Sequence, residues 1–187
     1  MSSRKLIQQR RQKEQKRVRL LLVMMGGGLA LVLGAVLFAV ISSNRVNLSP
    51  RQINLPEFSN QELVDFNTLG DPNAPVVIEE FSDFGCSHCG NFARENKVLI
   101  EEEYIQTGQV YLVFHSVGNL LSSPATFRAA EAAYCAGDQE AFWPFHDLLF
   151  ANQAALFTNP GADISRTMST FAEILSLDQE QFDACLT

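Results

Sequence analysis

The chain has 187 residues, which is enough for one folded domain plus an accessory segment. Its net charge of −7 is divided unevenly, because residues 1–51 carry +9 whereas residues 52–187 carry −16. A body this acidic repels phosphate backbones, which excludes nucleic acid as its expected partner.

The run Leu20–Ile41 contains 22 consecutive uncharged residues and predicts a transmembrane helix. At about 1.5 Å per residue the run reaches roughly 33 Å, enough to cross a bilayer core of about 30 Å. Residues 1–19 before it are strongly basic, whereas only Arg45 and Arg51 follow it closely. The positive-inside tendency therefore predicts a single-pass protein of the cell membrane, with residues 1–19 in the cytoplasm and the body outside.

A cleaved signal peptide is the alternative to a retained anchor. Its apolar region would normally be only about 7–15 residues long, so the length favours the anchor. Gly26, Ala30 and Gly34 have the spacing that lets two membrane helices approach closely, but glycine and alanine are common in such helices anyway. Dimerisation of the anchor stays open.

Residues 42–74 are polar and contain scattered prolines, and we expect them to form a linker with one short helix at Asn60–Phe66. The turn-rich stretch that follows announces a folded domain over residues 75–187. Val76–Phe81 predicts a strand, and Val110–Phe114 predicts a second strand that is apolar throughout. From Asn91 the apolar residues Phe92, Leu99, Ile100 and Tyr104 recur near helical spacing, which predicts a helix that stops at Gly108.

The resulting strand–helix–strand order predicts a βαβ unit with Cys86 and Cys89 at the switch from strand to helix. At a helix start, unpaired backbone N–H groups and the helix dipole stabilise a thiolate. His88, which lies between the cysteines, would add to this effect if it is protonated or donates a hydrogen bond. We expect Cys86 to be the attacked sulfur and Cys89 the resolving one.

Three other interpretations of the cysteine pair fit less well, and one of them, a plain structural disulfide inside one turn, is uncommon. A structural zinc site needs about four ligands, whereas the other two cysteines of this chain, Cys135 and Cys185, are isolated. A c-type haem needs histidine directly after the second cysteine, where this chain has Gly90. We therefore expect redox chemistry without a metal or a cofactor.

The segment Glu79–Cys89 resembles the DsbA-like branch of the thioredoxin superfamily, and so do the downstream stretches Ala130–Cys135 and Phe142–Phe150. The resemblance runs from about Val76 to the last residue. It implies an α/β, thioredoxin-like fold with a helical insertion from about residue 122. It also implies disulfide formation in reduced exported polypeptides, with reoxidation by a quinone-linked membrane oxidase such as a DsbB-like or vitamin K epoxide reductase-like protein.

Glu80 lies six residues before Cys86, where this family often has a buried acid near its active site. It would accept or relay the proton of Cys89 during exchange. Its neighbour Glu79 should face the other way on the strand. The alternative is that both are strand-edge or solvated acids.

The thioredoxin fold needs further strands after the insertion and a cis-proline loop beside the dithiol. None of the seven prolines precedes a strand-like run downstream of the insertion. We therefore expect the C-terminal strands to be missing, as in a fragment of a longer protein or a truncated gene product.

Four helices are predicted in the insertion. Pro124 follows the capping residue Ser123 in the first, which ends near Gly137; Asp138 caps the second, which runs to about Asn152; the third spans Ala162–Leu175; and Asp178 with Gln181 forms a capping box for the last. The aromatic side chains of the second helix are expected in the core.

Cys135 and Cys185 each lie on an apolar helical face. Outside the cytoplasm two spare cysteines tend to pair, and we expect a structural disulfide closing a loop worth roughly 4 kcal/mol in the chain-entropy model. Buried free thiols and a second redox pair are the alternatives.

Three functions remain in competition. The first is an oxidase that donates its disulfide, which the thiolate-stabilising His88 favours. The second is a reductase or isomerase of the same superfamily. The third is a non-catalytic, membrane-anchored binding module, which the missing C-terminal part favours.

Overall fold

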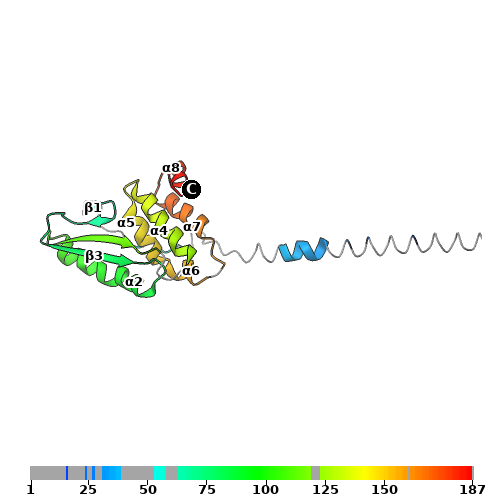
Figure 1. The fold of residues 1–187 in the computed structure, drawn as a ribbon, viewed down its shortest axis with the longest axis horizontal. Coiled ribbons are helices and arrows are strands. Elements are labelled where there is room, and N and C mark those ends of the chain that lie inside the picture. Colours follow the sequence, from blue (N-terminus) through cyan, green and yellow to red (C-terminus); the bar gives the residue numbers. More distant parts are fainter. Residues whose placement is uncertain are drawn as a thin grey trace, which may run out of the picture. The chain divides into compact units, whose positions relative to one another are not determined.

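Figure 1 presents the computed structural model of the chain. It describes Lys16, Met24, Gly27 and residues 31–38, 53–57, 63–118, 123–159 and 161–186. The chain divides into two compact units, Met1–Arg45 and Val46–Thr187.

In the first unit, residues 31–38 are helical. Most of the predicted transmembrane helix Leu20–Ile41 lies outside the described residues. Within the part that is described, no helix is both long and apolar enough to cross a membrane.

The second unit is built on a four-stranded sheet in the order β1-β2-β4-β3. The strands are β1 (Val64–Asp65), β2 (Thr68–Leu69), β3 (Val76–Ser82) and β4 (Val110–Ser116). β3 and β4 are parallel, with Ile78 opposite Leu112 and Glu80 opposite Phe114, which confirms the predicted βαβ unit. The two short strands pair antiparallel to each other and to β4.

The predicted linker over residues 42–74 is wrong for residues 64–69, and so is the part of the predicted helix Asn60–Phe66 that falls on β1; residues 60–62 of that helix lie outside the described residues. Residues 64–69 form the β1–β2 hairpin, and β2 extends the sheet by pairing with β4. The indole N–H of Trp143 donates to the Thr68 carbonyl at 2.9 Å and so fixes the position of this hairpin. Two-residue strands are too short for a period of two to be visible in sequence.

A continuous helical segment connects β3 to β4. It consists of α2 (Ser87–Asn91), η3 (Phe92–Asn96), α3 (Lys97–Ile100) and η4 (Glu101–Ile105), and Gly108, with φ of +74°, turns the chain into β4. The predicted apolar face of this segment is only partly buried, since Leu99 and Tyr104 are exposed. The buried stripe instead includes Lys97 and Glu101, which form an ion pair.

The insertion is helical, as predicted. It comprises α4 (Pro124–Gly137), α5 (Phe142–Ala151), α6 (Gln153–Phe157), α7 (Ile164–Ile174) and α8 (Gln179–Cys185), and Figure 1 shows α4, α5 and α7 grouped together. Asp178 caps α8, as expected, by accepting the N–H of Gln181 at 2.9 Å. Asp138 does not begin a helix: it follows the end of α4, and α5 starts only after Ala141.

The core between the sheet and the insertion is aromatic. Phe114 of β4 packs against Phe142 and Trp143 of α5, and all three side chains are fully buried. This confirms that the aromatic cluster of the insertion belongs to the core. The packing fixes α5 against the inner face of the sheet, which also carries Glu80.

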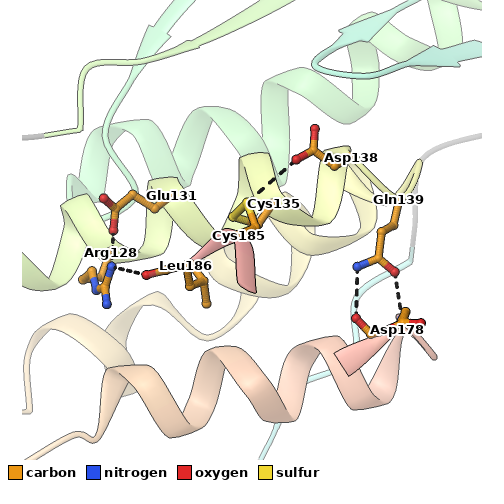
Figure 2. Close-up of a disulfide and its surroundings, with 8 residues drawn as sticks. All are labelled: Arg128, Glu131, Cys135, Asp138, Gln139, Asp178, Cys185 and Leu186. Atoms are coloured by element: carbon orange, nitrogen blue, oxygen red, sulfur yellow. Dashed lines mark hydrogen bonds and ion pairs between the residues drawn. A yellow bond between two sulfur atoms is a disulfide. The ribbon is translucent and has the colours of Figure 1, made fainter. Parts of the chain in front are cut away.

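A disulfide joins Cys135 of α4 to Cys185 of α8, with the two Cα atoms 5.7 Å apart and 50 residues of separation (Figure 2). Polar contacts flank it on both sides. Arg128 pairs with Glu131 and donates to the Leu186 carbonyl at 2.9 Å, while Gln139 exchanges two hydrogen bonds with the backbone of Asp178. Together these contacts tie α8 to α4.

Candidate active site

A tight turn at the C-terminal end of β3 positions the two thiols. The Asp83 carboxylate accepts the N–H of Gly85 at 2.7 Å, and the Asp83 carbonyl accepts the N–H of Cys86 at 3.0 Å. Cys86 then becomes the N-terminal cap of α2, and its carbonyl accepts the N–H of Gly90. The dithiol therefore lies at the switch from strand to helix, and both cysteines are free thiols in this structure.

Gln153 of α6 braces this turn, although nothing in the sequence singles it out. Its side-chain amide donates to the carbonyls of Phe84 and Cys86, each at 2.8 Å. The side chain is buried and passes so close to Gly90 that a Cβ there would lie 2.3 Å from the Gln153 Oε1. Gly90 is thus required for the close approach of α6 to the dithiol.

The two thiols differ in acidity. The backbone N–H of Cys89 interacts with the Cys86 sulfur and, together with the N–H of His88, lowers the pKa of Cys86. Burial raises the pKa of Cys89, because a thiolate is poorly solvated there. Cys86 is accordingly the better nucleophile and leaving group at neutral pH.

The His88 side chain is exposed at the surface. Its contribution to Cys86 in this structure is made by its backbone N–H rather than by its ring. His88 therefore stabilises the Cys86 thiolate through its backbone N–H, whereas the expectation was that its side chain would do so.

Glu80 lies on the inner face of β3, and its side chain alternates with exposed neighbours along the strand. Only 9% of the residue is exposed, and neither carboxylate oxygen makes a hydrogen bond of standard geometry. Burial raises the pKa of Glu80 to about 7, although Ser82 and Lys97 act in the opposite direction. Glu79 faces the other way, as predicted, and lies 3.6 Å from His115.

A cluster of buried charges lies next to Glu80. The Lys97 ammonium is 3.0 Å from Asp147 and 3.6 Å from Glu101. Burial opposes ionisation of Asp147, but His146 and Lys97 outweigh it, so that the pKa of Asp147 is lowered. Burial lowers the pKa of His146, so its neutral ring donates from Nδ1 to Asp147 at 2.8 Å.

This cluster borders a cavity of about 460 Å³. The lining includes charged side chains from the stretch before β1, from the helical segment between β3 and β4 and from α5, together with one aromatic ring: Glu57, Arg94, Lys97, Glu101, Asp147 and Phe150. No group of three or more His, Cys, Asp and Glu side chains in the described ranges is arranged to hold a metal ion.

Known proteins are similar to this chain in amino-acid sequence. A probable disulfide bond formation protein D of Bacillus anthracis is 28% identical over 123 residues, which are 66% of this chain and 52% of that protein. A Na(+)/H(+) antiporter NhaA 3 of Salinispora tropica is 36% identical over 113 residues, which are 60% of this chain but 16% of the antiporter. The chain thus spans about half or less of the length of these relatives.

Solved structures share the fold. Wolbachia pipientis alpha-DsbA1 matches with a TM-score of 0.56 and 25% identity, covering 72% of this chain and 62% of that one. Oxidised BdbD from Bacillus subtilis matches with a TM-score of 0.56 and 23% identity, covering 71% of this chain and 70% of that one. The family model described as thioredoxin matches residues 64–187, which include the strands β1–β4 and the helices α2–α8 described above. The chain therefore belongs to the thioredoxin family.

Proposed function

We propose that the chain is a DsbA-type thiol–disulfide oxidoreductase that forms disulfides in exported polypeptides with Cys86 and Cys89. The observation that carries this proposal is the position of Cys86 at the start of α2, where backbone N–H groups stabilise its thiolate. The names of the relatives, disulfide bond formation protein D and alpha-DsbA1, support the same activity.

In the oxidising direction, a substrate thiolate attacks the Cys86 sulfur of the Cys86–Cys89 disulfide. The bond between the two cysteines breaks, Cys89 leaves and takes up a proton, and a mixed disulfide links the substrate to Cys86. A second substrate thiolate attacks the substrate's own sulfur and expels Cys86 as a thiolate. The substrate loses two electrons and the dithiol gains them.

The direction of the reaction follows from the acidity of Cys86. A stabilised Cys86 thiolate stabilises the reduced dithiol, which makes the disulfide a stronger oxidant. This argument favours an oxidase over a reductase or isomerase. His88 contributes its backbone N–H to Cys86, and Glu80 exchanges the proton of Cys89.

The remaining assignments belong to the same proposal. The anchor at Leu20–Ile41 holds residues 1–19 in the cytoplasm and the catalytic domain outside, where a quinone-linked membrane oxidase, DsbB-like or vitamin K epoxide reductase-like, restores the disulfide. The charge asymmetry along the chain and the names of the relatives support this placement. The Cys135–Cys185 disulfide has a structural role, because it ties α8 to α4 and its Cys135 end is buried.

The substitution Cys89→Ser tests the proposal, because it removes the thiol that releases trapped substrate. We expect the Cys86 thiolate of the variant to attack disulfides of exported polypeptides, so that a mixed disulfide forms and the polypeptide's other sulfur leaves as a thiolate. These adducts should accumulate and be visible as bands that dithiothreitol removes from non-reducing gels. The matched control is the double variant Cys86→Ser/Cys89→Ser, which should form none. Equal amounts of adduct in both variants would show that another cysteine reacts.

A further inference from the structure

The buried proton of Cys89 needs a path to Glu80, and the structure offers one side chain for it. Ser82 lies two residues after Glu80 on the same inner face of β3, at the end of the strand next to the dithiol. Ser82 is also the last residue of β3, directly before the turn that carries the dithiol, and its side chain lowers the pKa of both Glu80 and Cys89.

The Ser82 hydroxyl is also unoccupied by other partners. The residue is 1% exposed, and its Oγ makes no hydrogen bond of standard geometry. The backbone around it is fixed, since the Ser82 carbonyl accepts the N–H of Val117 at 2.9 Å. A buried hydroxyl costs free energy when it has no partner, so a serine at this buried position calls for a role.

We propose that Ser82 relays the proton between the Cys89 thiol and the Glu80 carboxylate. This inference rests on the proposed function, because it concerns the step in which Cys89 resolves a mixed disulfide. Neither His88 nor Glu79 is placed for this task, since both side chains are exposed.

Resolution of the mixed disulfide moves one proton to Glu80 and two electrons to the bound thiol. Cys89 gives its proton to the Ser82 oxygen while the Ser82 hydroxyl gives its own to Glu80. The Cys89 sulfur attacks Cys86, the Cys86–Cys89 bond forms, and the bond from Cys86 to the bound thiol breaks and releases that thiol as a thiolate. No further oxidant is needed, because the mixed disulfide is itself the electron acceptor.

Charged groups on two other elements act on Glu80. Lys97 of α3 favours its ionised form, and Asp147 of α5 opposes it. The Cys86 thiolate feels the charge of Asp83 in the preceding turn. These groups are unchanged by substitution of Ser82, so a loss of the relay should leave the acidity of Cys86 intact.

The test is the variant Ser82→Ala of the full 187-residue chain in detergent, with its active-site dithiol reduced by limited dithiothreitol. Oxidised glutathione is added, samples are quenched with acid, and mass spectrometry of the intact chain follows the glutathione adduct. We expect adduct formation at the wild-type rate and resolution slowed about 100-fold at pH 7, within the range typical of lost proton transfer. The defect should shrink as the pH approaches about 10, where hydroxide takes the proton directly.

The matched control is Ser116→Ala, which removes the hydroxyl opposite Ser82 on β4 and should leave both rates unchanged. Resolution by Ser82→Ala within about threefold of wild type at pH 7 would overturn the relay. So would an equal loss in both steps at every pH, which indicates a structural defect. If the wild-type chain forms no adduct at all, the proposed function fails instead.

Discussion

Replacement of Cys86 by serine should reduce thiol–disulfide exchange by on the order of 1000-fold or more, to the uncatalysed background. A hydroxyl is neither a nucleophile toward disulfides nor able to form one, and Cys89 cannot replace it because burial raises the pKa of its thiol. The measurement is the rate at which the oxidised chain forms disulfides in a reduced, unfolded polypeptide.

The control for this prediction is the double variant Cys135→Ala/Cys185→Ala, which removes the other two cysteines. The variant should keep the exchange activity where it remains folded, because the disulfide that it lacks joins α4 to α8 and is not part of the dithiol. Substantial activity of Cys86→Ser would contradict the assignment of Cys86 as the attacked sulfur.

Replacement of Glu80 by glutamine should change how stability depends on pH. Burial raises the pKa of Glu80 to about 7 from an ordinary 4.5, so the folded protein retains this proton between those two pH values while the unfolded chain releases it. The stabilisation by the neutral acid is complete below pH 4.5 and lost as the pH rises through 7. The wild type should therefore lose roughly 3 kcal/mol relative to Glu80→Gln between acid and neutral pH.

Urea unfolding measures this difference, with the fluorescence of Trp143 as the signal. Trp143 is the only tryptophan of the chain and is fully buried in the second unit, so its signal reports on this unit. The matched control is Glu79→Gln, at an exposed site on the same strand, which should show little pH-dependent difference. A stability difference between wild type and Glu80→Gln that does not vary with pH would contradict the raised pKa of Glu80.

The dithiol and its immediate frame were predictable because they depend on local sequence. Cys86 and Cys89 follow a short β-rich run and precede a helical one, and this order alone places them at a strand-to-helix switch. Pro124 marks the start of α4 and Asp178 the start of α8 by capping chemistry that acts within a few residues.

The supporting residues were not predictable, because their partners are distant in sequence. Gln153 reaches the dithiol turn across 67 residues to Cys86, and Lys97 is buried only because Asp147 of α5 meets it in space. Lysine side chains are almost never fully buried unless they are paired, so the residue type alone gives no reason to expect Lys97 in the interior. Likewise, Asp138 has a capping side chain but α5 begins after Ala141, where the aromatic residues start to pack.

The redox potential of the Cys86–Cys89 pair tests the central claim most directly. The chain is equilibrated in glutathione buffers of defined potential, and alkylation counts the free thiols of the pair. The stabilised thiolate of Cys86 predicts a potential near or above about −180 mV, in the range of disulfide donors. A potential near about −270 mV, in the range of thioredoxin-like reductants, would contradict an oxidase.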